Sequence, residues 1–342
     1  MNTKKTYRYL IRLAVIAFVP LILLSCERIK DDMDDCGIYL EFIYDYNMEY
    51  TDSFDPQVGS VDLFVFDEAG KYLFTKQASR GELIGNKRMF LGGDLPFGQY
   101  KILTLGGLSG SFRVSDREGN EFIPGETDLE EVQVALKRES SVVSHEFPSL
   151  WIGTAQEVEY RADLSVYPVS LIKETNRFDM VLARSEGSSK EATITEAALY
   201  TFEIVTPEGA VYGHDNAPKR KEKVTYTPYF SAAGDGETEL SEACINTNRL
   251  FYAKEYDYRL IIRSAATGKL LWDYDLMNLL EHTKPASRPD GSTLPMQEYL
   301  DRQSEWHIVV LYKEEPGGGP EGFVAIKVVI NDWIVWINDI GV

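Results

Sequence analysis

The feature that most constrains the fold is an alternation of apolar and polar residues with a period of two, which recurs from residue 38 almost to the end of the chain. Ile38, Leu40, Phe42 and Tyr44 would lie on one face of an extended strand, because successive side chains in a strand point to opposite faces. The segment 61–66 repeats this spacing. The pattern predicts a chain built mainly of β-strands.

Turn signals divide the pattern into strands. Asp67–Gly70 separates the strand at 61–66 from a returning strand at 71–74, and Leu95–Tyr100 opens a strand that continues through residue 105. The sequence Leu-Pro-x-Gly-x-Tyr resembles a turn-and-strand entry common in transthyretin-like sandwiches. The second half repeats the arrangement weakly. Residues 197–205 predict a strand, 206–209 a turn and 210–212 the returning strand.

The last third predicts further strands and a little helix. Strands are expected at 306–312, 323–330 and 332–337, with Trp333 and Trp336 on opposite faces of the last one, so that at least one of them is expected in the core. Asp275 is placed to cap a short helix and Pro295 to begin another. We therefore predict an all-β fold of two tandem transthyretin-like (Greek-key) β-sandwich domains, with a short helical insertion near 273–303 in the second.

The N-terminus carries an export signal. Four basic residues and no acid precede an apolar run at 13–24, which is too short to span a bilayer, since a transmembrane helix needs ~20 residues. Leu23-Leu24-Ser25-Cys26 resembles the bacterial lipobox, in which cleavage follows a small residue and the cysteine receives lipid. We expect lipidation of Cys26, with palmitate among the possible acyl chains. An ordinary signal peptide with an incidental cysteine is the alternative.

The residues after Cys26 predict an acidic tether, because Lys30 is followed by four acids in Asp31–Asp35. This pattern resembles the surface-export signal of Bacteroidetes lipoproteins, although a solvated tether would also explain it. The expected organisation follows from these signals and from the length of the chain. It comprises a signal peptide at 1–25, a lipidated tether at 26–36, a first sandwich at 37–163 and a second at 164–342.

The net charge limits the classes of molecule that this protein is expected to bind, and the cysteine content allows one disulfide. Loss of the signal peptide would leave 31 basic and 54 acidic residues, a formal charge of −23. Such a chain repels nucleic acid and anionic lipid headgroups, so membrane contact is expected through the lipid alone. Apart from Cys26, the sequence contains two cysteines, Cys36 and Cys244. They could form a disulfide in an exported protein or stay as two free thiols.

No motif for catalysis or cofactor binding is present in the sequence. It lacks the spaced glycines of nucleotide-binding loops, the nucleophile elbow of hydrolases and a metal-ligand pattern. The four histidines, His145, His214, His282 and His307, lie far apart. We therefore expect a protein that is not an enzyme, with no catalytic residue, no cofactor and no metal site.

Three stretches resemble a known family. They are CGIYLEFIYDYNM at 36–48 with SVDLFVFDEAG at 60–70, LIKETNRF at 171–178, and QEYLDRQSEWHIVVLY at 297–312 with the terminal INDWIVWIND. They resemble the fimbrillin-associated anchor proteins, the FimB-like minor fimbrial subunits of Bacteroidales. The resemblance implies tandem sandwiches on a lipidated cysteine. It brings no catalytic residue, and only Cys26 carries over as a functional position.

The resemblance also implies a role and a place in cell adhesion. A family member would seat a fimbria, or pilus, in the outer membrane at the cell surface and limit its length. Its partners would be fimbrial shaft subunits, bound by β-strand complementation, in which one chain's strand fills a gap in another's sheet. Shaft subunits are thought to polymerise after proteolysis frees their first strand. An anchor protein that is lipidated next to its first strand would retain that strand, so no further subunit could insert there and the fibre would end.

The sequence is also compatible with three other functions. A fimbrial tip or minor shaft subunit would have the same sequence features. A surface glycan-binding lipoprotein of a polysaccharide-uptake system would need an exposed aromatic platform. A surface hydrolase would need a cleft with convergent carboxylates.

Overall fold

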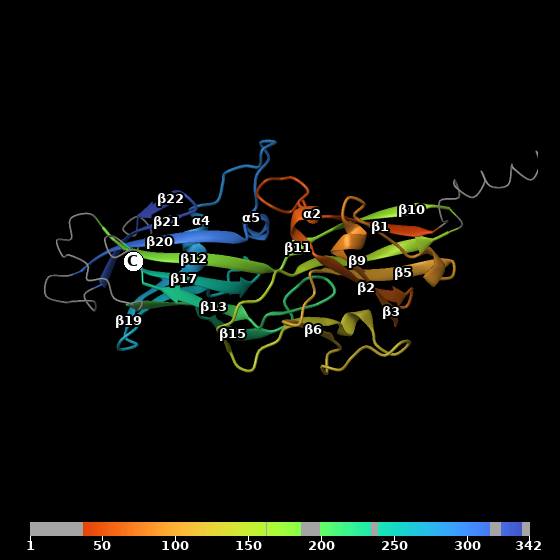
Figure 1. The fold of residues 1–342 in the computed structure, drawn as a ribbon, viewed down its shortest axis with the longest axis horizontal. Coiled ribbons are helices and arrows are strands. Elements are labelled where there is room, and N and C mark those ends of the chain that lie inside the picture. The colour runs from red at the N-terminus through yellow and green to blue at the C-terminus, as the bar shows by residue number, and fades with distance from the viewer. Residues whose placement is uncertain (1–36, 162, 186–198, 234–238, 315–322, 337–342) are drawn as a thin grey trace, which may run out of the picture.

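The computed structural model describes residues 37–161, 163–185, 199–233, 239–314 and 323–336. Strands account for 51% of it and helices for 10%, so the predicted all-β class is confirmed. Two lobes lie next to each other along the long axis of the molecule, with the first half of the chain forming most of one and the second half most of the other (Figure 1).

The first lobe is a sandwich of two sheets. In the smaller sheet β1 (Ile38–Ile43) occupies the centre, parallel to β10 (Ser165–Ser170) on one side and antiparallel to β4 (Arg88–Phe90) on the other. The larger sheet has the order β11-β9-β5-β2-β3. Its strands are β2 (Ser60–Asp67), β3 (Tyr72–Ser79), β5 (Gly98–Gly106), β9 (Trp151–Tyr160) and β11 (Ile172–Lys173). Short helical turns between the strands are α2 (Phe54–Gln57), α3 (Arg80–Leu83), η1 (Gly92–Asp94) and η2 (Leu129–Glu131).

The period-two pattern produces the core of this lobe. Ile38, Leu40 and Phe42 are each 0% exposed, and they pack with Val61 and Leu63 of β2 between the two sheets. The predicted hairpin after β2 is confirmed by its pairing with β3. Tyr100 anchors the start of β5, because its hydroxyl donates a hydrogen bond to the Pro96 carbonyl at 2.7 Å.

A third, small sheet connects the lobes and corrects one prediction. It has the order β14-β7-β6, with β6 (Phe112–Ser115), β7 (Gln133–Leu136) and β14 (Val211–Tyr212). The hairpin predicted for 197–212 is wrong. Strand β13 (Tyr200–Glu208) runs through the expected turn, and β14 pairs with β7. Ala210 adopts a positive φ of 54° and is fully buried, so the chain turns into the interface between the lobes.

The second lobe is a larger sandwich. One sheet has the order β16-β17-β12-β20-β21-β22, and the other β19-β18-β13-β15-β8. The strands of the first are β12 (Thr175–Arg184), β16 (Phe230–Ala232), β17 (Glu239–Asn248), β20 (Glu305–Glu314), β21 (Phe323–Ile330) and β22 (Trp333–Trp336). The second contains β8 (Val142–Val143), β15 (Lys221–Tyr226), β18 (Arg259–Ser264) and β19 (Leu270–Asp275) besides β13. Its core includes Phe178 stacked on Trp306, with ring centres 6.0 Å apart.

The helical insertion is confirmed in this lobe. Helix α4 (Leu276–Glu281) begins after Asp275, whose carboxylate accepts a hydrogen bond from the Asn278 backbone N–H at 3.1 Å. Helix α5 (Met296–Arg302) begins after Pro295. The buried face of α4 carries Leu276, Leu279 and Leu280 at helical spacing, and α5 buries Tyr299 and Leu300.

Several strand pairings cross the boundary expected between the two sandwiches, and one of them is the β14–β7 pairing described above. Residues 165–170, expected in the second sandwich, form β10 beside β1, and Val169 and Leu171 join the core of the first lobe. Strand β8 from the first half extends the sheet of the second lobe by parallel pairing with β15. Strand pairing therefore runs past the boundary expected between 163 and 164, and the chain passes from one lobe to the other at Glu174.

Candidate functional site

The predicted lipidation and disulfide positions are only partly visible. Cys26 and Cys36 lie outside the described residues. Cys244 lies on β17, half-buried, with no disulfide partner among the described residues. Burial, with the neighbouring Asp179 carboxylate, raises the pKa of this thiol, so it is held in its protonated form. The lipidated Cys26 and the Cys36–Cys244 disulfide stay predictions.

The structure does not bring the candidate metal-binding or catalytic side chains that it describes together into one site. Within the described ranges, no three His, Cys, Asp or Glu side chains are arranged to hold a metal ion. His145, His214, His282 and His307 lie on separate segments. Among the helices described, none has the length and apolar character needed to cross a bilayer. Two other features stand out, an exposed edge strand and a buried polar junction.

The exposed edge is β22, the last strand of the six-stranded sheet. Trp333, Ile334 and Trp336 are 53%, 57% and 49% exposed, whereas Val335 between them is buried. The prediction that one tryptophan is in the core is wrong. The strand lies at the edge of its sheet, and of its four side chains only Val335 joins the hydrophobic core. An edge strand with exposed apolar side chains is a site for pairing with another chain.

A tight turn fixes the position of this edge. Asn331 and Asp332 both adopt positive φ, at 45° and 70°, as a two-residue hairpin turn requires. The Asn331 side chain accepts a hydrogen bond from the His307 N–H at 2.8 Å and donates one to the Glu305 carbonyl at 3.1 Å. The β21–β22 hairpin is therefore tied to β20, and its outer edge is held in a defined place.

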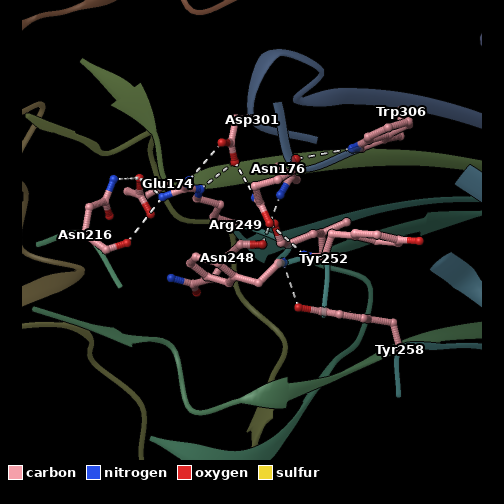
Figure 2. Close-up of polar contacts among 12 residues, drawn as sticks. Glu174, Asn176, Asn216, Asn248, Arg249, Tyr252, Tyr258, Asp301 and Trp306 are labelled. Carbon is pink, nitrogen blue, oxygen red and sulfur yellow. Dashed lines mark hydrogen bonds and ion pairs between the residues drawn. The ribbon is translucent and has the colours of Figure 1, made fainter. Parts of the chain in front are cut away.

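The second feature is a set of buried charges where the lobes meet, which we call the interlobe junction (Figure 2). Arg249 follows β17 and makes a bidentate pair with Asp301 of α5, with N–O distances of 2.7 and 2.9 Å. It also lies 3.5 Å from Glu174, which is fully buried between β11 and β12. The Asn216 amide donates to Glu174 at 2.8 Å. Four segments distant in sequence are thus joined by hydrogen bonds and ion pairs that involve charged groups.

The junction continues to the surface through Arg302. Its guanidinium donates to the Asp45 and Asn47 carbonyls of the first lobe at 2.8 and 3.2 Å. It also lies over the rings of Tyr46 and Tyr50, at 4.3 and 4.4 Å from their centres. Glu298 accepts from Arg302 on the same helix at 2.8 Å, so the arginine is held from both sides. Helix α5 is therefore fastened to the loop after β1.

The distinctive sequence stretches meet at this junction. Of the stretch at 36–48, Tyr46 takes part, 171–178 supplies Glu174, and 297–312 supplies Gln297, Glu298, Asp301 and Arg302. Arg249, the residue that pairs with two of these segments, was not singled out by the sequence analysis. The only available signal was an arginine directly after a strand, and this does not identify a partner 52 residues away.

Burial changes the titration of several carboxyls near the junction. It raises the pKa of Glu174 to about 7 in spite of the nearby Arg249, and that of Glu208 on β13 to about 8. Tyr258 is the side chain that interacts with the Glu208 carboxyl, and neither Glu208 oxygen forms a hydrogen bond of good geometry among the described residues. By contrast, the bonds from Arg288 and Arg302 lower the pKa of Glu298 to about 2. Glu208 is thus neutral and Glu298 ionised near pH 7.

Comparison with known proteins gives one family. The model of the fimbrillin-A associated anchor proteins Mfa1 and Mfa2 matches residues 33–339. No curated protein matches the sequence.

Solved structures resemble the chain over nearly its whole length. A proposed adhesin from Bacteroides ovatus is 45% identical, covers 88% of this chain and 95% of its own, and has a TM-score of 0.80. A proposed polysaccharide-binding protein from Bacteroides thetaiotaomicron is 30% identical over 89% of this chain and 98% of its own, with a TM-score of 0.74. The fimbrial anchor protein Mfa2 from Porphyromonas gingivalis shares the fold at 18% identity, with coverage of 88% and 98% and a TM-score of 0.65.

Proposed function

The chain belongs to the family of fimbrillin-A associated anchor proteins, and from this premise we propose that it seats a fimbria in the outer membrane and limits its length. Membership gives the coarser statement, a fimbrial protein of the cell surface. The proposal adds a lipid on Cys26, strand-mediated contact with shaft subunits, a place at the base of the fibre and the absence of catalysis.

The position of β1 is the observation that carries the anchor proposal. This strand begins two residues after Cys36, at the end of the tether, and it is paired on both sides, with β10 and β4. Its inward side chains are fully buried. Removing it would expose two rows of backbone hydrogen-bonding groups and the core at once, which is costly. A lobe that keeps its first strand offers no vacant place to a donor strand, so a fibre would end there.

The tether is long enough to place this closed lobe near the membrane. Ten residues, 27–36, separate Cys26 from Gly37, and an extended chain spans at most ~3.6 Å per residue. The first lobe would then lie within about 40 Å of the lipid. The second lobe, with the exposed edge β22, extends from the opposite side of the junction (Figure 1).

We propose β22 as the strand that meets the shaft subunit. Its outer edge has no neighbouring strand among the described residues, and its apolar side chains would be covered by a partner strand. Contact at this edge would place the fibre at the end of the molecule remote from the tether. Tension from the fibre would then cross both lobes through the interlobe junction.

Deletion of this protein tests the anchor role. The expected result is fimbriae that still polymerise but are longer or are shed, seen by electron microscopy of the cells and by assay of fibres in the medium. Complementation with the full chain should restore attachment, and complementation with Cys26→Ala should not. Fibres of normal length attached to deletion cells would contradict the proposal. Loss of all fibres would contradict it in favour of an initiating or tip subunit.

The exposure of Trp333 and Trp336 favours a second candidate, a surface glycan-binding lipoprotein. Both indole rings are about half exposed, with Lys327 over one face of Trp336 at 5.4 Å, and could stack on a sugar. The related protein from Bacteroides thetaiotaomicron is described as polysaccharide-binding. Binding of neutral polysaccharides by the purified protein, lost in the double variant W333A/W336A, would support this candidate. No binding, together with shed fibres in the deletion strain, would leave the anchor role.

A further inference from the structure

A basic groove interrupts the surface of this acidic protein. It lies between the small sheet β14-β7-β6 and strand β15, with a volume of about 480 Å³. Its principal lining side chains are Arg113, Lys137, Arg138, Arg220, Glu139 and Glu222. Four cations therefore face two carboxylates, whereas the whole chain has a formal charge of −19. Such a local reversal of sign marks a place where an anion is attracted.

Part of this positive charge is not neutralised by the protein. Arg138 pairs with Glu222 at 2.6 Å, and Arg220 donates to the neutral Gln133 side chain at 3.3 Å. Arg113 and Lys137 form no ion pair within the described part of the chain, and both are exposed. Three cationic groups thus remain available, on β6, after β7 and before β15. Because they come from three separate segments, they surround the groove instead of lying along one strand.

The floor of the groove is shallow and made of small residues. Gly209, Ala135 and Val211 line the groove together with the arginines. A Cβ on Gly209 would come within 2.9 Å of the Arg220 Cβ, so glycine is what lets these segments approach. No aromatic residue lines the groove, and it offers no deep apolar pocket for a protein side chain. A flat, polar ligand fits it better than an apolar peptide.

A second hollow extends the groove. It has a volume of about 510 Å³, and it shares Lys137, Arg138, Glu139 and Ser140 with the first. It adds Val142, the exposed hydroxyl group of Ser144, and His145. The two hollows together give an open channel with spaced charges and hydroxyls, which suits a chain of repeating polar units.

We propose that the basic groove binds an acidic polysaccharide, whose carboxylate or sulfate groups pair with Arg113, Lys137 and Arg220. The sugar hydroxyls exchange hydrogen bonds with the serines, and a ring face rests on the small-residue floor. Guanidinium groups bind carboxylate and sulfate in a two-pronged geometry. This site is separate from β22 and does not depend on the anchor role.

The test measures binding of defined probes to the full-length protein purified in detergent. Polygalacturonate supplies carboxylates, heparin supplies sulfates, dextran is the neutral control and polyglutamate the acidic peptide control. We expect saturable binding of polygalacturonate or heparin that weakens as salt is raised, because ion pairing dominates. The double variant R113A/R220A should bind roughly tenfold more weakly or worse, since two charge-assisted contacts are lost.

Matched variants separate the groove from general charge. K221A/K223A removes two exposed lysines of the neighbouring strand that do not line the groove, and it should change the affinity less than about twofold. R113K/R220K should recover part of the binding. No saturable binding of either acidic polysaccharide would overturn the proposal. An equal loss of affinity in R113A/R220A and K221A/K223A would overturn the proposal and indicate diffuse electrostatic attraction. Tighter binding of polyglutamate than of either polysaccharide would also overturn it and indicate an acidic protein partner.

Discussion

Arg302 of the second lobe lies over the ring of Tyr46 in the first lobe, with its guanidinium carbon 4.3 Å from the ring centre. The same group donates to the Asp45 and Asn47 carbonyls. One side chain therefore combines a cation–π contact with two hydrogen bonds across the interface between the lobes. Such a contact restricts how far one lobe can turn relative to the other, because both its direction and its distance are fixed.

We expect Arg302→Ala to lower the free energy of unfolding by about 1–3 kcal/mol, since the contact and both hydrogen bonds are lost. Urea denaturation of the full chain measures this. Arg302→Lys should lie between the variant and the natural protein, because a lysine keeps the charge without the planar fork. Arg117→Ala, at an exposed arginine, is the control. If Arg302→Ala and Arg117→Ala were equally stable, Arg302 would not stabilise the contact between the lobes.

Asp301→Ala should be more damaging than Arg302→Ala. It leaves Arg249 buried with its bidentate partner missing, and breaking a buried ion pair on one side costs ~3–5 kcal/mol. A double-mutant cycle with Arg249→Met gives the coupling between the two residues. We expect a coupling above ~1 kcal/mol, since the residues are in direct contact. Additive effects of the two substitutions would contradict this assignment.

Glu208 should make the protein less stable as pH rises. Folding raises the pKa of this carboxyl from 4.5 to about 8 through burial, so the folded chain holds a proton that the unfolded chain releases. The contribution of this proton to the free energy of unfolding is fully present below about pH 4.5 and is lost as the pH rises through about 8. Glu208→Gln should flatten this decline, by an amount on the order of a few kcal/mol. Denaturation curves from pH 5 to 9 measure it, with Glu49→Gln at an exposed carboxyl as control. An unchanged slope in Glu208→Gln would refute the prediction.

Substitution of the exposed tryptophans should separate binding from stability. W333S/W336S is expected to change the free energy of unfolding by less than about 1 kcal/mol, because both side chains are about half exposed. It should nevertheless reduce the amount of shaft subunit that co-purifies with the protein. Phe230→Ser, at the opposite edge of the same sheet, should leave co-purification unchanged. Equal recovery of shaft subunit with both variants would exclude β22 as the contact.

Lipidation at Cys26 is tested directly by metabolic labelling with an alkynyl fatty acid. Cys26→Ala should carry no label and should appear in the soluble fraction, since several acyl chains at ~0.8 kcal/mol per CH₂ hold the natural chain on the membrane. Cys36→Ala is the matched control, because it removes a cysteine ten residues away. Label on Cys26→Ala equal to that on the natural protein would disprove the site.

Local patterns predicted the local structure well. The alternation at 38–44 predicted the buried face of β1, and Leu95–Tyr100 predicted the entry to β5. The caps Asp275 and Pro295 predicted α4 and α5. Each of these depends on residues within one or two turns of the chain, where spacing and backbone preference act directly. The family resemblance was also available from the sequence, because it rests on contiguous stretches.

The tertiary structure alone decided which strands became neighbours and which surfaces stayed open. Strand β14 pairs with β7 and β10 pairs with β1, although both were expected elsewhere, because strand periodicity identifies a face but not a partner. Trp333 and Trp336 are about half exposed on an edge strand that has no further strand beside it among the described residues. Arg249 is buried because Asp301, 52 residues away, neutralises it there. Burial of a charge depends on partners distant in sequence, and the sequence pattern carries no record of that distance in space.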